Sequence, residues 1–235
     1  MNIYRFKEIN STNTFLKELD EKESYDIAIA EKQTLGRGRR GNKWSSEKGG
    51  AYFSFLLEEE RGISSEKYIK LPLVVGYSLL RTFEKMECLD FKFKWTNDIY
   101  VNDKKLSGIL VEKKANFYII GIGINLNNEI GKEFKEKGIS LKDINKKHYN
   151  KEEVIFKVID DFKNNLRYYL NGNWKEILDY LNSRNYLLGK KIIIDLRNKK
   201  EEGIGQEIDE SGEFLVEIKG EIKSFSIGEI HIKRR

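Results

Sequence analysis

QTLGRGRRGNKWSSEKGGAYFSFLLEE, Gln33 to Glu59, is the stretch that decides the fold class of this chain. Gly36 to Gly41 fits the pattern G-x-G-x-x-G, and Glu58 follows about 20 residues later, as in the fingerprint of dinucleotide-binding folds. In that fingerprint the glycines open a helix whose N-terminus holds a pyrophosphate. Here the loop leads through a glycine pair into the strand-like segment AYFSFLLEE, so no helix follows to hold a phosphate. The match is therefore accidental, and a doubly wound fold is excluded.

The loop itself places three glycines and three arginines in six consecutive positions. Arginine presents five donors in a planar fork that matches phosphate and carboxylate oxygens, and glycine lets a backbone approach a ligand closely or move. The combination is typical of an anion site that a loop covers. An RNA contact of the arginine-glycine type is an alternative, although the sequence has no second basic cluster and no RNP motif. A solvated basic loop is a third interpretation.

Helices are predicted at four places outside the loop, the last of them over Trp174 to Leu181. Ser11 or Thr12 is expected to cap a short helix through FLKEL. Apolar positions at helical spacing predict a helix over residues 66–87, with Pro72 in an early turn or at a kink. A longer helical pattern begins at Asn150, which stands in an N-cap position.

The remaining periodicity predicts strands. Those of the first part of the chain are YDIAIAEKQT, AYFSFLLEE, FKFKW, DIYVN, SGILVEKK and FYIIGIGINL. We therefore predict an α+β domain over residues 1–184, a mixed sheet flanked by helices. Past Gly189 the chain contains only short strand patterns, KIIIDLR, GIGQEI, EFLVEI and EIKSFSI, which predict a small barrel over residues 185–235.

Composition excludes several classes of protein. Charged residues make up 34% and apolar residues 39%, the balance of a globular chain, and no apolar run approaches the roughly 20 residues that span a bilayer. We expect a cytoplasmic protein without a membrane partner. The net charge is +5, but 38 acidic residues are mixed among 43 basic ones, so the chain is no polycation. The lone Cys88 is expected to be a small buried hydrophobe, and two distant histidines, His148 and His231, argue against zinc and against a Ser-His-Asp hydrolase.

Four motifs occur together in a recognisable order. They are NSTN at 10–13, QTLGRGRRGNKW at 33–44, KWTNDIYVNDKKLSGILVE at 94–112 and GIGINLN at 121–127. In this order and at these separations they resemble the biotin protein ligases, over nearly the whole chain. The resemblance implies a biotin/lipoate ligase-like catalytic domain followed by a small SH3-like C-terminal β-barrel.

The resemblance also implies a reaction in two steps. The carboxylate of biotin attacks the α-phosphate of ATP, giving biotinyl-AMP and pyrophosphate, and a lysine of the biotin carboxyl carrier protein of acetyl-CoA carboxylase then attacks the mixed anhydride. ATP and biotin would be substrates, with Mg²⁺ brought by ATP. A carboxylate with a pKa of about 4–5 is ionised at neutral pH, so the first step needs positive charge rather than a general base.

The motifs assign roles to residues by this resemblance. The expected catalytic residues are Arg37, Arg39, Lys105 and Asp98. The expected biotin contacts are Ser11, Thr12, Asn13, Gln33, Arg37, Gly38, Arg39 and Lys105, and those of ATP or the adenylate are Arg39, Arg40, Trp44, Asn97 and Asn125. No dedicated metal ligand is expected.

Some of these residues have a structural interpretation as well. The polar trio Ser11-Thr12-Asn13 can cap a helix, Arg40 can be solvated, Trp44 can belong to the core and Asn125 can form a turn. Asp98 would position or deprotonate the carrier amine, or help to hold Mg²⁺. Lys104 should point away from Lys105 if both lie in a strand.

Two features concern the subtype. Bifunctional members of the family carry an N-terminal DNA-binding domain, whereas this chain reaches the Ser-Thr-Asn motif within eleven residues. We therefore expect a ligase that does not bind DNA. The chain is expected to be a monomer or a homodimer. Thr96 stands where the family usually has proline, which removes a rigid turn but no charged group. A lipoate protein ligase is the alternative enzyme, and a nucleic-acid-binding module is the alternative from another class.

Overall fold

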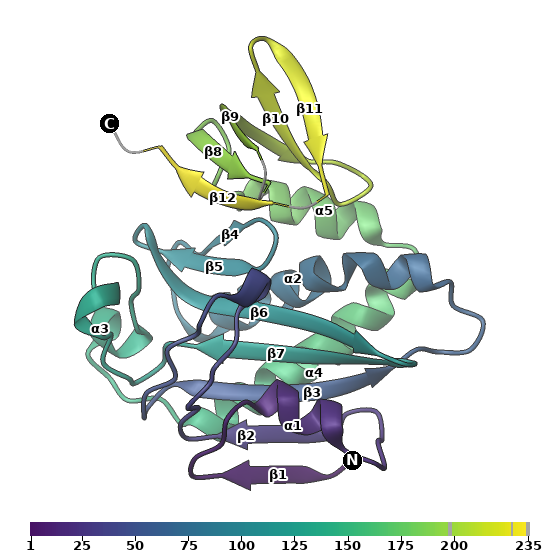
Figure 1. The fold of residues 1–235 in the computed structure, drawn as a ribbon, viewed down its shortest axis with the longest axis vertical. Helices are drawn as coiled ribbons and strands as arrows, with labels where there is room; N and C mark the ends of the chain where they lie inside the picture. The colour runs from purple at the N-terminus through teal and green to yellow at the C-terminus, as the bar shows by residue number, and fades with distance from the viewer. Residues whose placement is uncertain (197–198, 227, 234–235) are drawn as a thin grey trace.

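The protein forms two β-sheets, as a computed structural model describes for residues 1–196, 199–226 and 228–233 (Figure 1). The larger sheet has seven strands in the order β1-β2-β3-β7-β6-β5-β4. These are β1 (Ile3–Phe6), β2 (Ile27–Ala30), β3 (Ala51–Glu58), β4 (Lys92–Lys94), β5 (Asp98–Val101), β6 (Lys104–Lys114) and β7 (Phe117–Ile124). Strands β1 and β2 are parallel and every other pair is antiparallel, so the sheet is mixed.

Helices cover this sheet on both faces. They are α1 (Thr12–Glu18), α2 (Leu71–Met86), α3 (Leu141–Asn145), α4 (Lys151–Leu170) and α5 (Trp174–Ser183). Because side chains alternate along a strand, Phe53, Phe55 and Leu57 of β3 join the core that contains α2 and α4, whereas Leu56 packs with Leu16 of α1. Helix α1 is short and covers only part of its face, as Figure 1 shows, and the functional site lies beside its N-terminus.

The helix starts follow the sequence signals. Ser11 Oγ accepts from Thr14 N at 3.4 Å at the start of α1, and Asn150 Oδ1 accepts from Glu152 N and Glu153 N at the start of α4. Pro72 lies in the first turn of α2, where its missing N–H removes no helical hydrogen bond. A 3₁₀ turn over residues 65–70 replaces the first part of the helix predicted for 66–87.

The second sheet has five antiparallel strands in the order β11-β10-β9-β8-β12. They are β8 (Lys191–Asp195), β9 (Lys200–Ile208), β10 (Phe214–Ile218), β11 (Glu221–Phe225) and β12 (Glu229–Ile232). This sheet lies beyond β4, next to α5 (Figure 1). Trp95 connects the two sheets, because its ring stacks on Phe214 with the centroids 5.6 Å apart and its Nε1 donates to Gly212 O at 3.0 Å.

The predicted fold class is confirmed: a mixed sheet with flanking helices, followed by a separate antiparallel sheet. Strands β1 and β12 and helix α3 were not predicted. Cys88 was predicted to be buried but is exposed, because it follows the last turn of α2. Within the described ranges, no helix is long and apolar enough to cross a membrane.

Phe55 tests the assignment of the larger core. Its side chain is fully buried and its ring lies 5.1 Å from that of Phe162, centroid to centroid. We expect Phe55→Ala to lower the free energy of unfolding by about 3–5 kcal/mol, because it leaves a cavity between β3 and α4. Phe134→Ala is the matched control, since Phe134 is 38% exposed. Urea unfolding curves in which the two variants lose equal stability would contradict the core assignment.

Candidate functional site

A small pocket lies where the glycine-arginine loop and the N-terminus of α1 meet the centre of the larger sheet. Its volume is about 40 Å³. Sixteen residues line it: Ser11, Thr12, Asn13, Gln33, Arg37, Gly38, Trp44, Phe53, Asn97, Lys105, Gly108, Ile109, Leu110, Gly121, Ile122 and Gly123. The pocket therefore brings together residues from all four sequence motifs.

Glycines form the floor of the pocket. Gly108 of β6 and Gly123 of β7 are register partners, and Gly121 is the next residue of β7 on the same face. A methyl group added at Gly121 would lie 2.0 Å from Asn13 Oδ1, and one added at Gly123 would lie 2.5 Å from Trp44 Cε2. The intervening Ile122 belongs to the core on the opposite face. The alternation GIGI thus supplies a core surface on one face and a bare backbone on the other.

A chain of hydrogen bonds forms one wall of the pocket. Ser54 Oγ donates to Asn13 Oδ1 at 2.5 Å and lies 2.7 Å from Thr12 Oγ1. Gln33 Oε1 accepts from Thr12 N at 2.9 Å, and Gln33 Nε2 donates to Ser46 Oγ at 2.9 Å. Buried polar groups need such partners, so the chain fixes which atoms face the pocket.

The glycine-arginine loop folds back on itself like a hairpin. Trp44 N donates to Gly36 O at 2.9 Å, and Gly38 N donates to Asn42 O at 2.7 Å. A methyl group at Gly36 would lie 2.4 Å from Trp44 O, so the close approach of the two chain segments requires glycine. A 3₁₀ turn over Arg39–Gly41 closes the tip, and no α-helix follows, as the sequence predicted.

Trp44 fills the space above the glycine floor. Its Nε1 is buried and has no hydrogen-bond partner among the described residues. Lys105 Nζ lies 5.1 Å from the centroid of the ring, a cation–π contact. A buried donor without a partner costs about 1–3 kcal/mol, so this position of the ring is not its best possible one.

Lys105 is held at the edge of the pocket. Its Nζ lies 2.7 Å from Asp98 Oδ1, an ion pair that does not meet hydrogen-bond geometry. Lys104 points elsewhere, as predicted, and its Nζ donates to Lys135 O at 3.0 Å. Burial raises the pKa of the neighbouring Tyr100, and the Asp98 charge adds to the shift, so this phenol stays neutral at ordinary pH.

Arg39 is oriented by the KWTND motif. Its Nη1 donates to Thr96 Oγ1 at 2.5 Å and to Asn97 Oδ1 at 3.0 Å. The Trp95–Thr96 peptide bond is cis. The Thr96 hydroxyl that accepts from Arg39 is a group that proline lacks, and this contact was not predicted from the sequence.

A second cavity of about 120 Å³ adjoins the first and shares Asn97 and Lys105 with it. It is lined by Arg39, Arg40, Asn42, Lys94, Trp95, Asn97, Asp98, Lys105, Gly228, Ile230 and His231, so both sheets contribute to it. Arg40 Nη1 donates to Asp195 O at the end of β8 at 2.6 Å, which ties the loop to the second sheet. This cavity is strongly cationic and suits a polyanion.

The comparisons with known proteins agree with this geometry. A protein-family model, described as "Biotin/lipoate A/B protein ligase family", matches residues 5–127. The Bifunctional ligase/repressor BirA of Escherichia coli is 32% identical over 241 residues, which cover 96% of this chain and 72% of that protein. The chain belongs to the biotin/lipoate A/B protein ligase family. The family predicted from the sequence is thus confirmed.

A solved structure and a further sequence relative give the same family. The biotin protein ligase from Aquifex aeolicus in complex with biotin and ATP superposes with a TM-score of 0.88 at 35% identity, covering 100% of this chain and 99% of that one. The Biotin--[acetyl-CoA-carboxylase] ligase of Mycobacterium tuberculosis is 23% identical over 87% of this chain and 77% of that protein. Close homologues and structural neighbours of the chain are biotin protein ligases.

Within this ligase-family site, most of the predicted residues come together. Ser11, Thr12, Asn13, Gln33, Arg37, Gly38, Trp44, Asn97 and Lys105 line the first pocket, and Arg39, Arg40 and Asp98 line the second. Asn125 lies behind Lys105: its Nδ2 donates to Lys105 O at 3.4 Å and its Oδ1 accepts from Asn128 at 3.2 Å. It lines neither cavity, and its contact with an adenylate stays a prediction.

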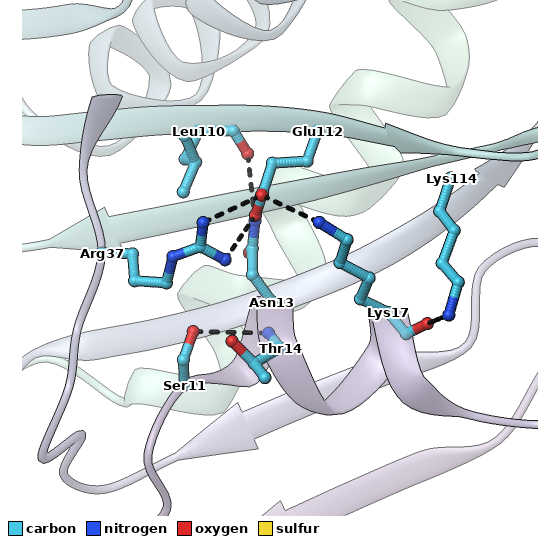
Figure 2. Close-up of polar contacts among 8 residues, drawn as sticks. All are labelled: Ser11, Asn13, Thr14, Lys17, Arg37, Leu110, Glu112 and Lys114. Atoms are coloured by element: carbon cyan, nitrogen blue, oxygen red, sulfur yellow. Dashed lines mark hydrogen bonds and ion pairs between the residues drawn. The ribbon is translucent and has the colours of Figure 1, made fainter. Parts of the chain in front are cut away.

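Three residues of the site were not predicted: Ser46, Ser54 and Glu112. Glu112 accepts from both Asn13 and Arg37 (Figure 2). A signal was present for Ser54, since it interrupts the apolar run AYFSFLL, and every residue of this run is buried. Glu112 closes the third motif, but neither charge nor spacing marks it as a partner of the loop.

Gly123→Ala tests the glycine floor. The added methyl would lie 2.5 Å from Trp44 Cε2, so we expect the indole to leave the floor. In protein labelled with 5-fluorotryptophan, the ¹⁹F resonance of Trp44 should shift, while those of Trp95 and Trp174 stay in place. Gly131→Ala is the control, because the nearest atom to its methyl would be 3.9 Å away. Unchanged Trp44 resonances in Gly123→Ala would contradict this description of the floor.

Proposed function

We propose that the chain is a biotin protein ligase that makes biotinyl-AMP and transfers biotin to a lysine of the biotin carboxyl carrier protein of acetyl-CoA carboxylase. The observation that carries the proposal is the junction of two cavities at Lys105 and Asn97. The first is lined mainly by glycine, apolar and neutral polar groups, with Arg37 and Lys105 as its cations. The second is lined by the cations Arg39, Arg40, Lys94 and Lys105 and by the carboxylate of Asp98. A reaction that joins a carboxylate to an α-phosphate needs these two compartments with a positive charge between them.

Biotin is assigned to the first pocket. Its ureido group offers donors and an acceptor, and the wall of Thr12, Asn13 and Gln33 offers complementary groups. The described residues that line this pocket include no histidine, cysteine or carboxylate. This suits a carboxylate substrate, which needs no general base. The Aquifex aeolicus relative is in complex with biotin and ATP, which supports both substrates.

Biotin binding requires Trp44 to move. A cavity of about 40 Å³ is far smaller than the roughly 300–1,000 Å³ of typical ligand pockets. The ring system of biotin needs the space in which the indole now lies. The unpartnered Nε1 of Trp44 favours such a movement, because the ring loses no hydrogen bond when it leaves the glycine floor.

The phosphates of ATP are assigned to the second cavity. Arg39, Arg40 and Lys105 line it, and Arg39 is oriented by two acceptors of the KWTND motif. Mg²⁺ arrives with ATP as part of the substrate. Among the described residues there is no group of three His, Cys, Asp or Glu side chains that could hold a metal ion. Asp98 is the carboxylate among the described residues that line the second cavity, and it can help to bind the Mg²⁺ that ATP brings.

Lys105 and Asp98 are assigned to the reaction centre. Lys105 faces the point where the carboxylate of biotin meets the α-phosphate, and Asp98 holds its ammonium group at 2.7 Å. In the transfer step Asp98 positions or deprotonates the amine of the carrier lysine, whose free pKa of about 10.4 keeps it mostly protonated at neutral pH.

A pyrophosphate-release assay tests the function directly. With MgATP and purified protein, we expect pyrophosphate to be released with biotin and not with lipoate, and the carrier protein to gain one biotin. Release with lipoate alone would instead favour the lipoate ligase. No release with either acid, together with salt-dependent retention of RNA or DNA on a filter, would favour the nucleic-acid-binding alternative.

The Lys105–Asp98 pair gives a second test. Lys105→Ala should slow single-turnover formation of biotinyl-AMP about a hundredfold, because it removes a charge that stabilises the transition state. Asp98→Asn should slow both adenylate formation and transfer. Lys104→Ala is the control and should stay within about twofold of the wild type, since Lys104 points away from the site. Wild-type rates of both steps in Asp98→Asn would refute its role.

A further inference from the structure

Glu112 is a carboxylate that lines neither cavity but binds two residues that line the first. It lies on β6 with its side chain 16% exposed. Arg37 binds it with both terminal nitrogens, Nη1 at 3.2 Å from Oε2 and Nη2 at 3.1 Å from Oε1. Asn13 Nδ2 donates to Oε2 at 3.0 Å, and Lys17 Nζ lies 3.5 Å from Oε1 (Figure 2). One carboxylate thus joins helix α1, the sheet and the glycine-arginine loop.

Glu112 fixes which way the Asn13 amide faces, together with the backbone carbonyl of Leu110. A carboxylate only accepts hydrogen bonds, so Asn13 turns its Nδ2 towards Glu112 at 3.0 Å, and Leu110 O accepts from the same nitrogen at 3.5 Å. Its Oδ1 therefore faces Ser54 and the pocket floor, where a methyl at Gly121 would lie 2.0 Å from it. The reverse orientation would set a carbonyl oxygen against a carboxylate, which is repulsive. Glu112 makes Asn13 an acceptor on the pocket side.

The same orientation passes along the hydrogen-bonded wall. Because Ser54 gives its single proton to Asn13, the 2.7 Å contact with Thr12 has Thr12 as donor. The Thr12 hydroxyl has one proton as well, so its 3.2 Å contact with Gln33 Oε1 competes with the contact to Ser54. Gln33 Oε1 then accepts from Thr12 N, and Gln33 Nε2 donates to Ser46. The direction of the hydrogen bonds in this wall therefore follows from the orientation of the Asn13 amide, to which Glu112 is bound.

Glu112 also decides where the loop rests. Arg37 is the loop residue that reaches the larger sheet by a two-point contact, and this contact fixes the guanidinium plane. Its side chain is 44% exposed, so the pair is partly screened and can open. Removing the charge of Glu112 would release Arg37 and the orientation of Asn13 together.

We propose that Glu112 is a positioning residue for the biotin pocket: it presents Asn13 Oδ1 to a ring N–H of biotin and holds Arg37 where the loop closes on the adenylate. The proposal rests on the proposed ligase function and adds a residue that acts through two others. Lys17 only balances the charge, since it reaches one carboxylate oxygen at 3.5 Å and does not line the pocket.

Glu112→Gln is the first experiment. We expect the dissociation constant for biotin, measured by titration calorimetry, to rise about tenfold, because a charge-assisted contact to Asn13 is lost. Biotinyl-AMP should dissociate about tenfold faster, while the KM for ATP stays within about twofold. Glu59→Gln is the matched control: Glu59 accepts from Lys113 and Tyr118, and its side chain is 20% exposed. It should change none of these quantities more than twofold.

A polarity swap separates positioning from stability. Asn13→Asp alone sets two carboxylates together and should weaken biotin binding at least tenfold. In the double variant N13D/E112Q the glutamine amide can donate to the new carboxylate, whose other oxygen remains an acceptor on the pocket side. Binding of biotin should therefore recover most of the loss. Melting curves by circular dichroism establish that each variant is folded, and the double variant carries the test if Glu112→Gln alone does not fold.

The outcomes distinguish the two proposals. Biotin affinity within twofold of the wild type in Glu112→Gln, equal losses for biotin and ATP, or no recovery in N13D/E112Q would overturn the role of Glu112. A wild-type protein that binds biotin but releases no pyrophosphate would overturn the ligase function and leave the calorimetric test of Glu112 intact. A wild-type protein that binds no biotin would overturn both.

Discussion

The whole site depends on three positions of the central strands that carry no side chain. Gly108, Gly121 and Gly123 lie on one face, and only their bare backbone lets Asn13 and Trp44 approach the sheet. On the other face Ile120, Ile122 and Ile124 of β7 belong to the core that contains α2 and α4, so the strand cannot move away to make room. A side chain at Gly121 or Gly123 would collide with Asn13 or Trp44.

Three cations of the site are already bound by protein acceptors. Arg37 rests on Glu112, Lys105 on Asp98, and Arg39 on Thr96 and Asn97. A group held in place before an anion arrives needs little reorganisation, which is how fixed charges stabilise a transition state. Two of these partners are carboxylates and two are neutral.

The sequence predicted what depends on local pattern and missed what depends on contacts across the fold. Alternation gave the central strands, and cap residues such as Ser11 and Asn150 gave helix starts, because these signals lie within a few residues. Strand β1 was missed, since its four residues pair only with β2 across helix α1. The four motifs located most of the candidate site. Glu112 and Ser54 were missed because their partners lie 75 to 99 and 41 to 42 residues away.

The three arginines of the loop end on three different parts of the protein. Arg37 reaches β6, Arg39 reaches the segment between β4 and β5, and Arg40 reaches β8 of the second sheet. Arg40 adopts a left-handed backbone conformation, with φ of 55°, which turns its side chain away from those of its neighbours. The loop can therefore take this position only while both sheets are in place. Since partly exposed ion pairs stabilise weakly, a bound anion can compete for Arg37. The contact of Arg40 with the carbonyl oxygen of Asp195 is instead a hydrogen bond to the backbone. The loop thus has one neutral attachment to the second sheet, at Arg40, and one ion pair, at Arg37, that a ligand can displace. The region of the second sheet also supplies Gly228, Ile230 and His231 to the second cavity, so it supports both the loop and the cavity.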